Sequence, residues 1–228
     1  MSSNVKYSKE FVDKVRYLMS RRRSKKLDDT YAQFNEDERP LFTELIVECG
    51  ADPLEYLDNI PAYYAYNTSL YKELKVPDHI KSIGEYAFLN AGLIRVYTGH
   101  NLESIEEGAF ASNYYLKELY LDNKGTLKKI GRGAFSSCPN LEGTIIWSGI
   151  EEIDSQAFEL CSHMKELRLF SSIKRIGYGA FCGCNELEVW YYGTFEQFKQ
   201  VKVDDAYLTH VHCLLNKSSN DWVLYGLD

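Results

Sequence analysis

The sequence contains no segment of the kind that crosses a membrane or directs secretion. No stretch of its 228 residues approaches the run of about 18 apolar residues that a membrane-spanning helix requires. The first residues, MSSNVKYSKEFVDKV, lack the basic start and the apolar run of about 7 to 15 residues found in a secretion signal. We therefore expect a soluble, cytoplasmic protein that does not contact membranes.

Residues that interrupt or cross-link a fold are also few. The chain has 5 prolines, 15 glycines and no long tract of one residue type, while 45% of its residues are hydrophobic, so most of it should fold around an apolar core. Six cysteines would suggest disulfides in a secreted protein, but without a secretion signal we expect reduced thiols. The length alone allows one or two domains.

Charge is unevenly distributed in a chain whose net charge is −7. Residues 1–26 contain nine Lys or Arg and two acidic residues, giving +7, whereas residues 27–60 contain Arg39 and ten acidic residues, giving −9. The overall negative charge argues against a protein wholly devoted to nucleic acid, and the two segments are expected to attract each other.

One motif recurs at a nearly constant interval. The dipeptide Ala-Phe ends at Phe88, Phe110, Phe135, Phe158 and Phe181, with spacings of 22, 25, 23 and 23 residues. An Ile lies five residues before each Phe, an Ile or Leu lies three residues before that Ile, and the motif continues as x-x-C-x-x-L-x-x-L-x-L. A unit of about 23 residues cannot bury its own apolar side, so the five copies must stack and share one core.

This stacking predicts an α/β solenoid of five repeats over residues 76–192. Segments such as LKELYLD alternate in polarity like a strand, whereas IGRGAFSSC has the small and polar residues of a tight helical or 3₁₀ arc. One strand per repeat would build a parallel sheet. The Ala and Phe of each repeat should lie in the core, with the ring filling the space between layers.

The motif resembles the BspA-like leucine-rich repeats, also called the Treponema pallidum type, whose units read roughly I-x-x-I-G-x-x-A-F-x-x-C-x-x-L-x-x-I. The phrases IKSIGEYAF, LKKIGRGAFSSCPNLE and IKRIGYGAFCGCNELE carry the match, which covers about residues 74–215. Departures are Glu106 and Asp154 where Gly is usual, and Asn113 in place of Cys. The resemblance implies a leucine-rich-repeat solenoid, and many members of the family are cell-surface or pathogen proteins.

The segments on either side of the repeats lack the motif. Residues 1–75 are predicted to form a helical domain or cap, with a first helix that begins at Ser8 and a second that carries Leu41, Leu45 and Ile46 and ends at Gly50. We also expect short helices in PLEYLDNI and PAYYAYNTSLYKEL. Residues 193–228 are predicted to be a C-terminal cap, and the segment VWYYGTFEQFKQVKV, which begins at Val189, resembles the closing part of such arrays.

Side chains that could perform chemistry do not form a recognisable site. Cys138, Cys161 and Cys184 occupy equivalent repeat positions and are best explained as small buried thiols in an internal column. The five His residues are scattered over different repeats, and no phosphate-binding glycine loop is present. We therefore predict no metal site, no cofactor and no enzymatic activity.

The exposed side of the sheet carries the residue types that dominate protein interfaces. Strands of the form L-x-x-L-x-L bury the leucines and turn the intervening residues outward. The repeat spacing aligns Tyr97, Tyr120, Ile145, Arg168 and Tyr191 in one exposed row. The residues expected to contact a protein partner are Tyr97, Glu118, Tyr120, Trp147, Glu166, Arg168, Phe170 and Tyr191.

A basic cluster supports an alternative function. Arg21, Arg22, Arg23, Lys25 and Lys26 could contact the phosphates of a nucleic acid, although cations are also favoured at the end of a helix by its dipole. The favoured interpretation is a non-enzymatic interaction module that binds a protein partner, of the kind that a phage or a pathogen could encode as an effector for a host cell. The alternative is a nucleic-acid-associated factor.

Overall fold

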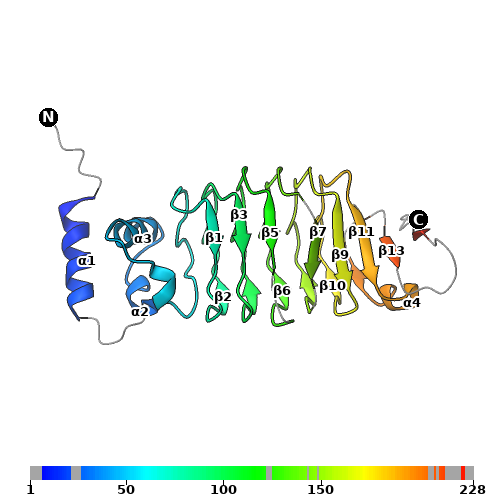
Figure 1. Cartoon of the computed structure of the whole chain (residues 1–228), viewed down its shortest axis with the longest axis horizontal. Coiled ribbons are helices and arrows are strands. Elements are labelled where there is room, and N and C mark those ends of the chain that lie inside the picture. The colour runs from blue at the N-terminus through cyan, green and yellow to red at the C-terminus, as the bar shows by residue number, and fades with distance from the viewer. Residues whose placement is uncertain are drawn as a thin grey trace.

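A computed structural model shows an elongated solenoid with helices at its N-terminal end (Figure 1). It describes residues 7–21, 27–121, 125–142, 144–147, 149–204, 208, 211–213 and 222–223, with the side chains of residues 18–21, 144–147 and 222–223 left aside. The chain winds repeatedly around one core, so segments one repeat apart in sequence lie side by side. The predicted solenoid of parallel strands is confirmed.

Two faces of the solenoid are built from strands. The first sheet face holds β1 (Glu73–Lys75), β3 (Arg95–Tyr97) and β5 (Glu118–Tyr120), followed by β7 (Thr144–Trp147), β9 (Glu166–Phe170), β11 (Glu188–Tyr192), β13 (Val211–Cys213) and β14 (Trp222–Val223). The second sheet face holds β2 (Ser82–Ile83), β4 (Ser104–Ile105), β6 (Lys129–Ile130), β8 (Glu152–Ile153), β10 (Arg175–Ile176) and β12 (Lys202–Val203). Among the described residues every strand pair is parallel except β13 with β14.

The phenylalanines of the motif form a continuous column in the core. Neighbouring rings from Phe88 to Phe181 have centroids 5.4, 5.2, 5.1 and 5.7 Å apart and planes within 10° of parallel. All five rings are buried. This spacing is close to the distance between adjacent strands, so each turn of the chain adds one ring to the column.

A second column satisfies backbone carbonyls beside the rings. The thiols of Cys138, Cys161 and Cys184 donate to the carbonyls of Phe110, Phe135 and Phe158 at 3.3, 3.2 and 3.2 Å. Asn113 replaces Cys in this column, and its Nδ2 donates to the carbonyls of Phe88 and Phe110, both at 2.8 Å. These three thiols are buried and form no disulfide, as the sequence predicted.

An additional turn precedes the five predicted repeats. Ile60 forms a parallel bridge with Ile83, and Tyr63 and Asn67 adopt the positive φ angles found at Tyr86 and Asn90 one turn later. The short helix expected in PAYYAYNTSLYKEL is therefore wrong, because this segment is a solenoid turn that leads into β1. The predicted boundary at residue 76 falls inside the array.

Helices close the N-terminal end of the array. They are α1 (Lys9–Arg21), α2 (Asp28–Tyr31), α3 (Glu38–Glu48) and the 3₁₀ helix η1 (Pro53–Tyr56). Ser8 caps α1 by accepting a hydrogen bond from the Phe11 amide at 3.1 Å, as expected. The buried ring of Tyr31 lies 5.6 Å from that of Tyr64, which lies 5.6 Å from Phe88, so the apolar cores of the helices and the array are continuous.

At the other end, β11 is followed by the short helix α4 (Phe195–Phe198). Thr194 and Gln197 form a capping box at its start. The buried Phe198 meets the ring of Tyr191 edge-on at 5.0 Å, which places both rings in the core beside the last turns of the array.

Candidate binding surface

The first sheet face presents ordered rows of side chains on β1, β3 and β5. Tyr97 and Tyr120 are paired across the strands, and their rings stack with centroids 4.8 Å apart and planes 3° apart. Lys75 extends this row, with its Nζ 6.0 Å from the centre of the Tyr97 ring. Tyr120 remains 48% exposed. Tyr97 is half-buried and Tyr120 is exposed, so both project outward from the sheet, and their role in binding a partner stays a prediction.

The neighbouring row on the same strands is ionic. Arg95 lies between two carboxylates, with nitrogen–oxygen distances of 2.6 Å to Glu73 and 3.1 Å to Glu118. The Tyr120 hydroxyl donates to Glu118 at 2.7 Å and ties the ionic row to the aromatic one. Hydrogen bonds from Tyr120 and then Arg95 lower the pKa of the Glu118 carboxyl, and those to Glu73 and Glu118 raise the pKa of Arg95.

A second group of ordered rows lies on β9, β11 and β13. Arg168 pairs with Trp190, which pairs with His212, and the Trp190 and His212 rings stack with centroids 4.0 Å apart. Phe170 stacks on Tyr192 at 4.8 Å. Arg168 also donates to Glu166 at 2.6 Å. Glu166, Arg168 and Phe170 therefore belong to the sheet surface, as predicted.

Tyr191 does not belong to that surface, and this prediction is wrong. Its side chain is 1% exposed, and its backbone pairs with the buried Leu169 rather than with Arg168. The reason is a shorter turn: Leu167 follows Cys161 by six residues, whereas Val189 follows Cys184 by five. A shift of one residue moves a strand side chain to the opposite face, so Tyr191 points into the core.

A second shift of one residue affects β7, because Ile145 follows Cys138 by seven residues and Leu167 follows Cys161 by six. Ile145 therefore pairs with Leu167 instead of Arg168, and Trp147 pairs with the buried Leu169. The side chain of Trp147 lies outside the described part of the structure, so its role in binding stays a prediction. The surface residues that the sequence interpretation missed are Trp190, Tyr192 and His212. The alternation of apolar and polar residues within each strand, taken separately, would have identified them.

The basic cluster also lies outside the part of the chain that the structure describes. Arg21 is the last residue of α1, but its side chain is not described, and the same holds for all of Arg22, Arg23, Lys25 and Lys26. Nucleic-acid binding by this cluster stays a prediction.

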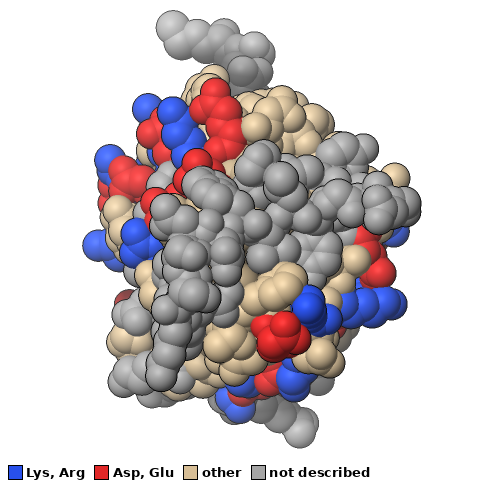
Figure 2. Space-filling model, turned by 90° about the vertical axis from the view of Figure 1, so that its right-hand side faces the viewer, with Lys and Arg blue, Asp and Glu red and all other residues tan. Residues whose placement is uncertain are grey.

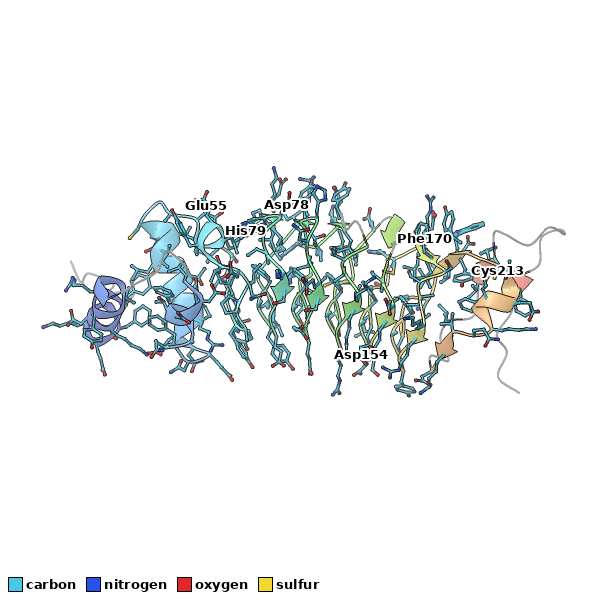
Figure 3. The ribbon with its side chains drawn as sticks, turned by 90° about the horizontal axis from the view of Figure 1, so that it is seen from below. Glu55, Asp78, His79, Asp154, Phe170 and Cys213 are labelled. Atoms are coloured by element: carbon cyan, nitrogen blue, oxygen red, sulfur yellow. The ribbon has the colours of Figure 1, made fainter. Side chains whose placement is uncertain are left out.

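Ion pairs between successive turns extend along the second sheet face. Basic and acidic side chains lie next to each other around the C-terminal end of the molecule (Figure 2). Figure 3 shows Asp154, which belongs to the second sheet face, and Phe170, which belongs to the first, on opposite sides of the array. The ion pairs between turns of this face include Lys81–Glu103, Lys128–Glu151, Lys174–Glu151, Lys129–Asp154, Arg175–Glu152 and Arg175–Asp204. The acidic pair Glu151 and Glu152 thus has a structural explanation.

The described residues offer little else for chemistry. They contain no group of three or more His, Cys, Asp or Glu that could hold a metal ion. Burial raises the pKa of the Cys138 thiol to about 12 and that of the Cys161 thiol as well, so these groups are poor nucleophiles near neutral pH. No described helix is long and apolar enough to span a bilayer.

Comparison with known proteins agrees with this architecture. The sequence of residues 58–188 matches the BspA type leucine rich repeat region in six copies. This number agrees with the additional turn that begins near Ile60. A search of the curated proteins finds no relative.

Three bacterial structures share the fold. A leucine rich cell surface protein from Faecalibacterium prausnitzii has a TM-score of 0.54 and 24% identity over 58% of this chain and 35% of its own. The Treponema pallidum leucine rich repeat protein has a TM-score of 0.52 and 23% identity over 66% of this chain and 74% of its own. A leucine-rich repeat protein from Bacteroides ovatus has a TM-score of 0.54 and 23% identity over 72% of this chain and 47% of its own.

The match thus spans about a third of the first protein and about half of the third. At these identities the likeness is one of fold. The sequence match to the family is stronger evidence, since it covers more than half of the chain and coincides with the stacked turns. The chain therefore belongs to the BspA type leucine-rich-repeat family.

Proposed function

We propose that this chain is a non-enzymatic protein-binding module that engages its partner through the first sheet face. The observation that carries the proposal is the pair of ordered surface groups on that face. One group centres on the stacked Tyr97 and Tyr120, and the other on Arg168, Trp190 and Tyr192. Tyr, Trp and Arg are the residue types that most often dominate binding energy.

Order in these side chains favours binding. Because each ring is held against a ring of the next strand, it loses little conformational freedom when a partner covers it. The Glu118 carboxylate fixes the Tyr120 hydroxyl, and Glu166 fixes the Arg168 guanidinium. The surface is therefore largely preorganised, and a partner that matches it avoids part of the entropic cost of ordering it.

Charge on this face suggests the chemistry of the partner. The acidic residues are Glu73, Glu118, Glu166 and Glu188, and Arg95, Arg168 and Lys75 neutralise part of their charge. Glu188 is exposed at the end of the row that contains Glu166. We propose a folded protein partner with an apolar patch bordered by Lys or Arg residues.

The test compares two pairs of exposed tyrosines. The double variant Tyr97→Ala with Tyr120→Ala removes the stacked pair, while Tyr114→Ala with Tyr115→Ala removes two tyrosines that are 54% and 66% exposed in the turn before β5. A partner captured by the wild type from cells of the source organism would be purified and titrated against each variant by calorimetry. We expect the affinity to fall by about tenfold or more for the first variant only.

Equal affinities for the two double variants would remove the first sheet face from the proposal. The nucleic-acid alternative has its own test, a salt titration with random single-stranded RNA and duplex DNA. Steeply salt-dependent binding that is lost when Arg21, Arg22 and Arg23 are all replaced by Ala would support the alternative instead.

A further inference from the structure

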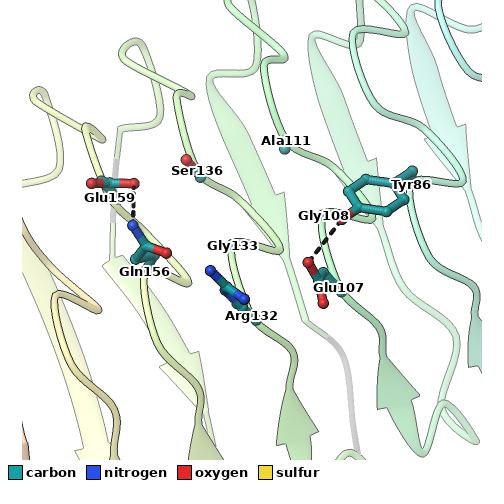
Figure 4. Close-up of a pocket in the computed structure, with 9 residues that line it drawn as sticks. All are labelled: Tyr86, Glu107, Gly108, Ala111, Arg132, Gly133, Ser136, Gln156 and Glu159. Atoms are coloured by element: carbon teal, nitrogen blue, oxygen red, sulfur yellow. Dashed lines mark hydrogen bonds between the residues drawn. The ribbon is translucent and has the colours of Figure 1, made fainter.

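A polar groove lies outside both sheet faces, on the turns that carry the Ala-Phe motif (Figure 4). Its volume is about 260 Å³, and four successive turns contribute to it. This is below the roughly 300 Å³ of pockets that hold drug-sized ligands, so the groove suits a smaller ligand. The lining residues are Tyr86, Glu107, Gly108, Ala111, Arg132, Gly133, Ser136, Gln156 and Glu159.

One row of backbone positions explains the shape of the groove. Each turn has a residue with positive φ two positions before the Phe of the motif, and Gly108 and Gly133 occupy this position in neighbouring turns. Tyr86 and Gln156 occupy it in the turns on either side, with φ values of 53° and 60°. The ring of Tyr86 covers Gly108, so Gly133 alone leaves an open floor, between walls made by Tyr86 and Gln156.

The Tyr86 wall is fixed in place. Its hydroxyl donates to Glu107 Oε1 at 2.8 Å, and its ring lies so close to Gly108 that a Cβ at that glycine would be 2.4 Å from Cδ1 and Cε1. At the opposite end, Gln156 Nε2 donates to Glu159 at 3.2 Å. The groove is therefore lined by side chains that already hold defined positions.

Both signs of charge face the groove. Arg132 lies between Glu107 and Gln156 in Figure 4, is exposed, and forms no ion pair within the described residues. An anion would gain from Arg132 but meet Glu107 and Glu159, and a cation would meet Arg132. A neutral ligand rich in hydroxyl groups can donate to both carboxylates and accept from the guanidinium, Ser136 and Gln156.

We propose that this groove binds a neutral carbohydrate, with one sugar ring seated over Gly133 between the ring of Tyr86 and the side chain of Gln156. The polar lining offers no apolar pocket for a peptide side chain, whereas the edge of an aromatic ring with adjacent carboxylate, amide and guanidinium groups suits a ring that carries hydroxyls. This site is separate from the protein-binding surface proposed above and does not depend on it.

The test uses the methyl glycosides of glucose, galactose, mannose, fucose and N-acetylglucosamine as probes. Each would be titrated against the full chain by saturation-transfer NMR. We expect a millimolar dissociation constant for at least one of them, which corresponds to a binding free energy of about −4 kcal/mol. Gly133→Gln copies the neighbouring Gln156 and fills the floor, and a Cβ there meets nothing closer than 3.8 Å. We expect it to weaken binding by about tenfold or more.

Gly179→Gln is the matched control. Gly179 occupies the same backbone position two turns from Gly133, with φ of 63° against 57°, and a Cβ there also has room. It does not line the groove, and its Cβ would lie 3.7 Å from Gln156 Cγ, an ordinary van der Waals contact, so sugar binding should stay unchanged. Arg132→Ala, at an exposed side chain, gives a second test should Gly133→Gln fail to fold, and should also weaken binding.

Three results would overturn the proposal. The first is that no methyl glycoside binds, and the second is that Gly133→Gln or Arg132→Ala binds as tightly as the wild type. The third is that only sialic acid and glucuronic acid bind and that Arg132→Ala abolishes this binding, which would identify an anion site in place of a site for a neutral sugar.

Discussion

The ring of Tyr97 lies flat on the ring of Tyr120, with planes 3° apart and centroids 4.8 Å apart. This geometry follows from the register of β3 and β5, because residues paired across parallel strands project to the same side at about the strand spacing. The same rule stacks Phe170 on Tyr192 and Trp190 on His212. Repetition of the fold thus converts single aromatic residues into ordered surface rows.

Replacing an outward tyrosine and an inward one should have very different effects on stability. Tyr120 is half exposed, so Tyr120→Ala should leave the urea midpoint of unfolding nearly unchanged. Tyr191 is buried against Phe198, and Tyr191→Ala should lower the free energy of unfolding by about 3–5 kcal/mol. Urea denaturation followed by circular dichroism measures both. Similar losses for the two variants would contradict the register described here.

The sequence was sufficient to predict the solenoid, because the Ala, Phe and Ile positions recur in all five repeats. The register of the first sheet face was not predictable from the Phe spacing. The turn from the Cys column to the strand differs in length between repeats, as the six residues from Cys161 to Leu167 and the five from Cys184 to Val189 show. Only the alternation of each strand taken separately identifies its inward residues.

The first turn escaped detection because its motif is reversed. Tyr64 and Ala65 stand where the later turns have Ala and Phe, as the bond from the Ala65 amide to the Ala87 carbonyl and that from Phe88 to Ala109 show. The ring of Tyr64 still reaches the column, where it meets Phe88 at 64°. A tyrosine-rich segment without the Ala-Phe dipeptide gives no repeat signal in the sequence.

Asn113 should contribute substantially to the stability of the fold, although it is only a single replacement within the Cys column. It donates to the carbonyls of Phe88 and Phe110 and accepts from the Leu93 amide at 3.1 Å, all in the core. Asn113→Ala would leave these groups without partners, and we expect a loss of about 2–4 kcal/mol in the free energy of unfolding. Asn113→Cys should lose less, because a thiol at this position can donate to the Phe88 carbonyl as Cys138 does to Phe110. Equal losses would contradict this role of the side chain.

The buried thiols predict how stability depends on pH. Burial raises the pKa of Cys138 from 9.0 to about 12, so above pH 9 the unfolded chain releases this proton first. The stability that the protonated thiol contributes is complete below pH 9 and is lost as the pH rises toward 12. The loss is at most about 1.4 kcal/mol per pH unit for each such thiol. Denaturation series between about pH 8 and pH 10 would measure it, and comparison with Cys138→Ala separates it from the loss due to buried tyrosines such as Tyr31, whose pKa burial raises above the ordinary value of about 10.

Cys138→Ala should make the fall in the free energy of unfolding with pH shallower, since it removes one of the groups whose pKa differs between the folded and the unfolded chain. Cys49→Ala removes an exposed thiol and serves as the control, with the wild-type decline expected. An unchanged slope in Cys138→Ala would show that another group is responsible for the loss of stability at high pH.

The junction between the helices and the array should behave as one core. The Tyr31 ring lies 5.6 Å from the Tyr64 ring. The Thr43 hydroxyl joins the two residues through hydrogen bonds to the Tyr31 hydroxyl at 2.8 Å and to the Tyr64 carbonyl at 2.6 Å. Tyr64→Ala should cost about 3–5 kcal/mol by opening a cavity, whereas Tyr64→Phe should cost only about 1 kcal/mol for its hydrogen bond to Tyr71. Tyr31→Ala combined with Tyr64→Ala should cost less than the sum of the single changes, because the two rings share one cavity. Unfolding energies from a double-mutant cycle would show this coupling, and strictly additive values would mean that the helices stabilise the array by contacts other than this aromatic junction.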